Sequence, residues 1–218
     1  MKILLTIIVL FLVIWTGWSY FGTRNIERPQ ILSSIMLSGW VEKRTIAPMI
    51  QAVVMVSGSQ DQAINAWFRL IAWYIFGSNR SQESVAMTTP VALSQVEQSS
   101  SETIAMTAPV ATEHVWSSYR VSFMMPSRYT LATLPVPVDP RVTFVEIPSQ
   151  TYYVWSFAGY ANASRAQSQL GKFIYALAMQ DIKTEWLSTP ILNQYNDPWT
   201  MPLMRHNEWW IKVWEESK

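Results

Sequence analysis

The side chains that could carry out chemistry in this 218-residue chain are few, and they exclude several classes of enzyme. The sequence has no cysteine, so it can form no disulfide, thiolate metal site or cysteine nucleophile. Its two histidines, His114 and His206, lie far apart along the chain and leave little material for a zinc site. A glycine-rich phosphate loop and a Gly-x-Ser-x-Gly motif are also absent from the sequence. We therefore expect a protein without catalytic activity and without protein ligands to a metal.

Two methionines stand in a repeated phrase. The segment Val85–Val91 contains Met87, and the similar segment Ile104–Val110 contains Met106 nineteen residues later. Between them lies a stretch rich in Ser, Gln and Glu, so the pattern predicts a β-hairpin with a solvated loop. A methionine in such a strand is either a core residue or part of the apolar wall of a groove, and one side chain can be both.

The composition suits a site for a flat apolar ligand. Apolar residues make up 50% and aromatic residues 13% of the chain, with 12 Trp and 11 Met. Such side chains form either an ordinary core or the lining of a groove. The 16 basic and 15 acidic residues give a net charge of +1. This balance argues against nucleic acid as a partner, because nucleic-acid binders normally carry a basic excess.

The first 21 residues predict a membrane anchor. Ile3–Phe21 is uncharged over 19 residues, which as a helix would span about 30 Å, close to one hydrocarbon core. Trp15, Trp18 and Tyr20 gather at its end, as in an interfacial aromatic belt. The competing interpretation is a cleaved signal peptide, but Gly17–Gly22 makes a poor cleavage site. We expect a single-pass protein that contacts the bilayer through residues 3–21, with its folded part outside the cytoplasm although the flanking charges are nearly balanced.

Strand-like and helical periodicities alternate beyond a tether expected at 22–38. Val41–Val56 predicts two strands separated at Pro48, and Gln60–Phe76 has helical spacing that should end at Gly77 and Asn79. Further predicted strands are Val85–Leu93, Thr103–Ala111, Tyr119–Met125, Val142–Ile147, Tyr152–Phe157, Pro190–Tyr195 and Glu208–Trp214, with a helix after Asn162.

The two halves of the chain share this order. Ile46 and Ile147 are 101 residues apart, as are Gly58 and Gly159, and Thr-Pro pairs follow in both halves. The fold expected is α+β: a duplicated strand–helix–strand–strand unit whose two copies pack into one barrel-like or sandwiched sheet, with both helices outside. We assign 39–214 to one monomeric domain with pseudo-repeats at about 39–133 and 141–214, followed by a tail at 215–218.

Five phrases in this sequence resemble the SOUL family of haem-binding proteins. They occur in the family's order, and the resemblance runs from about Gly39 to Val213. The phrases are Tyr74–Asn79, Ala86–Val91, Ala105–Val110, Val121–Ser127 and Arg205–Trp210.

The resemblance implies a non-covalent ligand, haem or a related tetrapyrrole, in an apolar groove. It implies that the duplicated unit forms a distorted antiparallel β-barrel flanked by two helices, with a helix face and the Met-Thr-x-Pro-Val strand as the walls of the groove. The cofactor-binding residues expected on this basis are Met87, Met106, Trp67 and Ile71, with Arg80 as a partner for a propionate.

The sequence departs from the family at one proposed iron ligand. Some members have a histidine after the arginine of the first strand, whereas this chain has Thr45 after Arg44. We therefore expect no strong axial protein ligand, an exposed His114, and a hydrogen-bonding role for His206. The Asn207-Glu208 pair should anchor the last strand by side-chain to backbone hydrogen bonds. Two other functions stay open, a protein–protein interaction module and a sensor of another apolar small molecule.

Overall fold

The computed structural model describes residues 2–21, 26–37, 40–57, 70–71, 73–81, 85, 89–95, 118–182, 188–196 and 200–213. Its named helices are α1 (Lys2–Phe21), α3 (Ala163–Ala178) and the short 3-10 helix η3 (Pro202–Met204). The strands are β1 (Ile31–Met36), β2 (Val41–Ile46), β3 (Met49–Ser57), β4 (Val91–Gln95), β5 (Ser118–Met124), β6 (Thr143–Ile147), β7 (Gln150–Ala158), β8 (Ile191–Gln194) and β9 (His206–Lys212).

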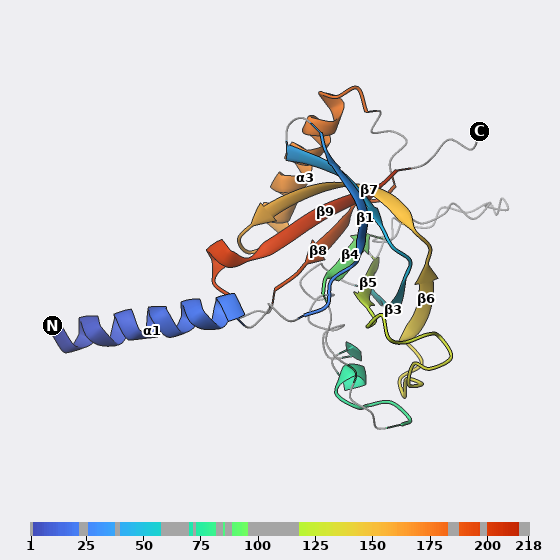
Figure 1. Ribbon diagram of the computed structural model, residues 1–218, viewed down its shortest axis with the longest axis horizontal. Helices are drawn as coiled ribbons and strands as arrows, with labels where there is room; N and C mark the ends of the chain where they lie inside the picture. Colours follow the sequence, from blue (N-terminus) through green and yellow to red (C-terminus); the bar gives the residue numbers. More distant parts are fainter. Residues whose placement is uncertain are drawn as a thin grey trace, which may run out of the picture.

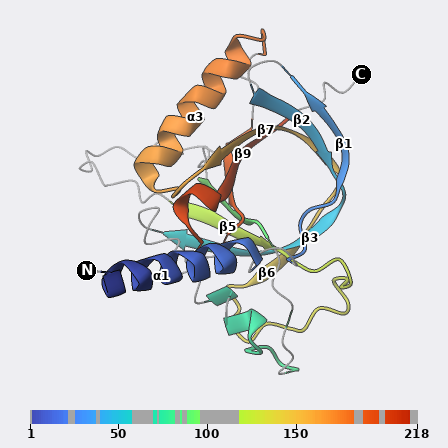
Figure 2. The same ribbon diagram turned by 60° about the vertical axis from the view of Figure 1, so that its left-hand side comes forward.

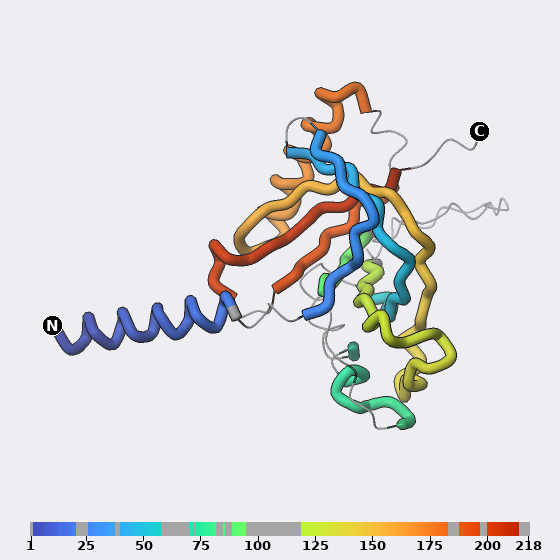
Figure 3. The backbone as a smooth tube through the Cα atoms, in the orientation of Figure 1, coloured from blue at the N-terminus to red at the C-terminus, as the bar shows by residue number. Residues whose placement is uncertain are grey.

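The strands form a single antiparallel sheet, so the α+β class is confirmed. Their order across the sheet is β1-β2-β7-β9-β8-β4-β5-β3-β6. The sheet curls strongly into a half-barrel, with α3 packed on its outer face (Figures 1 and 2). The backbone tube in Figure 3 follows the same path from β1 to β9.

Two bent stretches of chain hold the curl. β2 continues into β3 through Pro48, and β6 continues into β7 through Pro148. β2 pairs with β7 and β3 pairs with β6 in one common register, which would place the two prolines opposite one another. Proline has no N–H to donate, so the hydrogen-bond ladder between the two stretches is interrupted at these positions. Each stretch can therefore bend there and continue on the other side of the curled sheet.

The outer face of the sheet carries the main core. Alternate residues of the strands point outward, and they pack against the apolar stripe of α3 that the sequence predicts. Phe173 of α3 stacks on Trp155, and Trp209 Nε1 donates a 3.0 Å hydrogen bond to the carbonyl of Ala166. The predicted cap of this helix is confirmed, since Asn162 Oδ1 accepts a 2.9 Å hydrogen bond from the Arg165 N–H.

The helical residues 70, 71 and 73–75 cover another part of the outer face. Their end falls where the sequence predicts it: Gly77 has a φ of 104°, a conformation that only glycine adopts without strain. Asn79 Nδ2 donates to the carbonyl of Tyr74, and the Tyr74 hydroxyl donates to the carbonyl of Pro135 at 3.0 Å. The second bond ties the helix end to the connection between β5 and β6.

Some predicted elements differ from the structure or lie outside the described residues. β1 lies within the stretch expected to be a tether, and β4 begins at Val91 instead of Val85. The predicted strand at 103–111 and most of the predicted helix at 60–76 lie outside the described residues.

α1 projects away from the half-barrel (Figure 1). Its Lys2–Tyr20 segment has a mean hydropathy of 2.2 and is only 6% buried. By length and composition it could cross a membrane, and a signal sequence has the same properties.

Candidate functional site

Two of the five predicted site residues are described by the structure, and it does not bring them together in a groove. Ile71 is fully buried in the outer-face core. Arg80 is exposed, and its backbone N–H donates a 2.9 Å hydrogen bond to the carbonyl of Val136. Trp67, Met87 and Met106 lie outside the described residues, so the groove predicted between the first helix and the Met-Thr-x-Pro-Val strand stays a prediction.

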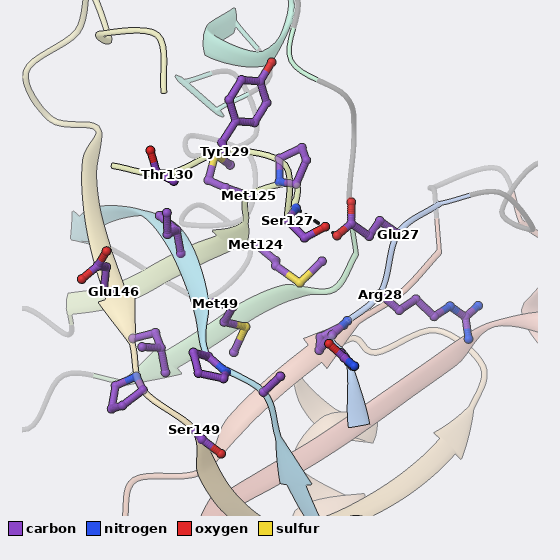
Figure 4. Close-up of a pocket in the computed structure, with 18 residues that line it drawn as sticks. Glu27, Arg28, Met49, Met124, Met125, Ser127, Tyr129, Thr130, Glu146 and Ser149 are labelled. Carbon is purple, nitrogen blue, oxygen red and sulfur yellow. Dashed lines mark hydrogen bonds between the residues drawn. The ribbon is translucent and has the colours of Figure 1, made fainter. Parts of the chain in front are cut away.

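A cavity of about 760 Å³ lies where the sheet bends. Four chain segments form it: residues 27–30 before β1, the bend at 47–50, the end of β5 with its following loop at 124–130, and the bend at 146–149 (Figure 4). This volume falls in the range of pockets that take a drug-sized ligand or a cofactor.

The walls of this methionine-lined cavity are mostly apolar. Figure 4 shows Met49 and Met124 between the bends and the segment before β1, with Met125 and Tyr129 above them in the view. Met124 and Met125 are both nearly fully buried. Methionine is flexible and polarizable, so such a wall adapts to a flat aromatic ligand and its sulfur contacts the ring favourably.

Residues 27–30 are fixed to four other parts of the molecule. Glu27 accepts the Ser127 N–H at 2.9 Å through its carboxylate, and its carbonyl accepts the Thr89 N–H at 3.0 Å. The Arg28 guanidinium lies 5.6 Å from the centre of the Tyr195 ring. The Gln30 carbonyl accepts the Ala47 N–H at 2.9 Å, at the bend between β2 and β3. Residues 27–30 of the expected tether therefore form one wall of the cavity.

A second cavity of about 410 Å³ lies inside the curl of the sheet. It shares Pro29, Met49, Met124 and Ile147 with the methionine-lined cavity, so the two spaces adjoin. Arg120 of β5 and Lys212 of β9 line it, and they supply positive charge beside the apolar wall. Tyr152 also lines it, and burial raises the pKa of that phenol to about 12 although Arg120 acts in the opposite direction.

A buried carboxylate, that of Glu208 on β9, lies at the centre of a hydrogen-bonded cluster of side chains. Glu208 is 2% exposed, and its Oε2 accepts hydrogen bonds of 2.6 Å from the Tyr195 hydroxyl and from Trp210 Nε1. Its Oε1 lies 3.1 Å from Arg44 Nη1 and 2.9 Å from His206 Nε2. A buried charge needs this number of donors to remain ionised.

The charges in this cluster support one another. Burial by itself would raise the pKa of Glu208, but the His206 hydrogen bond, the Arg44 charge and the Tyr195 hydroxyl hold it at about 2. Arg44 also bonds Glu42 through Nε and Nη2, at 2.9 and 2.5 Å. Burial and the neighbouring carboxylate raise the pKa of Tyr195, so its hydroxyl stays protonated and donating.

This Glu208 cluster is structural, since none of its acidic or basic groups lines either cavity. The prediction for Asn207 is confirmed: its Nδ2 donates to the carbonyl of Gly159 at 2.8 Å. The prediction for Glu208 is wrong, because its partners are side chains and not the backbone. The sequence could not show this, since Arg44 and Glu208 are 164 residues apart.

The chain belongs to the SOUL family. The family model described as "SOUL heme-binding protein" matches residues 33–102 and 94–212. The human protein named "Heme-binding protein 2" is 28% identical over 151 residues, which cover 69% of this chain and 66% of that protein.

One solved structure has the same general fold. The EcmrR C-terminal domain superimposes with a TM-score of 0.51 at 11% identity, over 81% of this chain and 98% of that one. A hydrolase from Listeria innocua matches at a TM-score of 0.48 and 11% identity, over 79% of this chain and 90% of that one. Likeness at this level concerns the fold and carries no information on activity.

The residues of the two cavities fit a tetrapyrrole. The thioether and proline side chains of the first cavity suit the faces of a flat apolar ring. Arg120 and Lys212, which line the second cavity, suit its carboxylates. Methionine sulfur and the Tyr129 phenol are the possible iron donors in the first cavity, since no histidine or cysteine lines it. His206 is engaged with Glu208 elsewhere. Among the described residues no group of three or more His, Asp or Glu could hold a bare metal ion.

Proposed function

We propose that this protein binds haem or a related tetrapyrrole without covalent attachment and without catalysing a reaction on it, and that α1 holds it on a membrane. The observation that carries the proposal is the match to the haem-binding family model over nearly the whole length after the anchor, residues 33–102 and 94–212. Binding, buffering or delivery of the ligand are the roles that need no further catalytic group.

The methionine-lined cavity is the site we assign to the ring. Met49, Met124 and Met125 would hold its apolar faces and exclude water, while Arg120 and Lys212 in the adjoining cavity would face its carboxylates. When bound, haem supplies a redox-active iron centre. The protein supplies the dry slot, the neighbouring positive charges and a fixed position near the membrane.

The duplication of the domain is also part of this proposal. Equivalent strands have equivalent neighbours: β3 pairs with β5 as β7 pairs with β9, and β4 pairs with β5 as β8 pairs with β9. β4 and β8, which would be equivalent, pair with each other. This arrangement supports two copies of one unit related by a twofold axis. We also propose that the domain works as a monomer outside the cytoplasm.

Haemin titration tests the function and the site together. The full chain in detergent should give a saturable shift of the Soret band at one equivalent. Burial of a methionine side chain contributes about 1.5–3 kcal/mol, so Met49→Ala should weaken binding by roughly tenfold or more. The matched control is Met55→Ala, since Met55 lies on the same strand but is exposed and lines neither cavity.

Each result of this titration has a distinct meaning. Without a saturable Soret shift in the unmodified chain, the haem-binding function is wrong. Equal affinities for the two variants would exclude the methionine-lined cavity as the site. Met87→Ser then tests the groove implied by the family resemblance. If Met87→Ser clearly weakens haemin binding and Met49→Ala leaves it unchanged, the ligand lies against the Met-Thr-x-Pro-Val strand.

A further inference from the structure

The end of α1 is in contact with the loop that carries η3. The Ser19 hydroxyl accepts a 3.0 Å hydrogen bond from the backbone N–H of Met201, and Thr16 Oγ1 lies 3.4 Å from the Met201 sulfur. Ser19 is 4% exposed, whereas most of α1 is open. Figures 1 and 2 show η3 beside the end of the helix in both views.

This contact fixes the level of the loop along the helix axis. Thr16 lies inside the Lys2–Tyr20 segment that is long and apolar enough to cross a membrane. It precedes the end of α1 by five residues, or about 7 Å at 1.5 Å per residue. Met201 therefore lies level with the last turns of the apolar segment and not beyond them.

The side chains next to Met201 are of the kinds found at a bilayer surface. Leu203 of η3 is 90% exposed, the most exposed of the large apolar side chains described. Tyr160 is about half exposed, and the Arg205 guanidinium lies 4.3 Å above its ring. An aromatic ring with a polar tip and a cation beside it suit the headgroup level, where an exposed leucine can enter the acyl boundary.

We propose that the segment Met201–Arg205 rests on the membrane that α1 crosses, with Leu203 inserted at the boundary between headgroups and acyl chains. The partner is the lipid surface, and the inference rests on the proposed anchoring by α1. The half-barrel is then docked on the bilayer through one defined face, and it does not swing freely on a tether.

The absence of cysteine from the chain makes the test direct. Single variants Leu203→Cys, Val138→Cys and Ile8→Cys of the full chain are labelled with an environment-sensitive fluorophore. They are reconstituted into phosphatidylcholine vesicles with or without bromine on the upper acyl chains. Val138 is the matched surface control, because it is an exposed apolar residue in the connection between β5 and β6. That connection lies away from α1 in Figure 1. Ile8 reports on the anchor itself, and circular dichroism confirms that each labelled variant is folded.

The proposal expects a blue-shifted emission and marked quenching by brominated lipid at Leu203, with neither at Val138. Quenching at Ile8 without quenching at Leu203 overturns the docking while leaving the anchor in place. Equal quenching at Leu203 and Val138 also overturns it, because the domain would then approach the bilayer without a preferred face. An unquenched Ile8 refutes the anchor, and with it the docking.

Discussion

The Glu208 cluster gives a prediction whose size follows from the structure. Glu208→Gln keeps the shape of the side chain and removes its charge. One amide oxygen then replaces a carboxylate that accepts hydrogen bonds from Tyr195, Trp210, Arg44 and His206. The new amide NH₂ would also face donors, so we expect the variant to be destabilised and still folded.

The expected magnitude comes from the pKa. The carboxyl titrates at about 2 in the folded protein against 4.5 when unperturbed. A unit of pKa corresponds to about 1.4 kcal/mol, so at neutral pH the charged form contributes about 3 kcal/mol to the free energy of unfolding. Because the folded pKa is depressed, this contribution is present above pH 4.5 and is lost as the pH falls toward 2. At pH 3 roughly 1 kcal/mol of it should remain.

Urea denaturation of the full chain in mild detergent, followed by near-ultraviolet circular dichroism, measures this effect. The free energies of unfolding of the wild type and Glu208→Gln should differ by about 3 kcal/mol at pH 7 and by about 1 kcal/mol at pH 3. Glu146→Gln is the control, since that carboxylate lies on the edge strand β6 and should show a small, unrelated difference. A difference that stays the same at both pH values would refute the reasoning, because the loss would then come from packing and not from charge.

Three further predictions concern other parts of the molecule. Tyr74→Phe removes the buried hydrogen bond to Pro135 and should lower the free energy of unfolding by about 1–2 kcal/mol in the same urea assay; no change would show that water replaces it. His206→Ala should change haemin affinity less than about threefold, because His206 bonds Glu208 and lines neither cavity, and loss of the Soret shift would make it the iron ligand. The intact mass of the protein isolated from the membrane fraction should correspond to a chain that retains residues 2–21. A mature chain starting near residue 22 would identify α1 as a cleaved signal.

Local patterns predicted the elements that depend on neighbouring residues. The apolar stripe and the Asn162 cap of α3 lie within one short stretch, and Pro48 marks the bend between two β-branched runs. Such features carry their own signal, since capping and side-chain periodicity depend on residues a few positions apart. The family resemblance was likewise carried by short phrases.

The candidate site lacked any such signal. Its methionines come from β3 and from the end of β5, some 75 residues apart, and their closeness depends on the register of a curled sheet. Alternation along β9 puts Glu208 and Trp210 on one face, but nothing local pairs Glu208 with Arg44. The stretch before β1 looked like a tether because its composition is mixed. Residues 27–30 of this stretch are held by contacts with distant segments.

The wall at 27–30 has a practical consequence for where the domain can be cut. The family match begins at residue 33, and the charged and apolar residues before it would normally be removed to obtain a soluble fragment. Such a fragment would lose four residues that line the cavity, together with the carbonyl partner of the Ala47 N–H at the first bend. An affinity measured on it would describe a site with one side open. Since only residues 22–26 separate this wall from α1, the ligand would be held within about 20 Å of the end of the anchor.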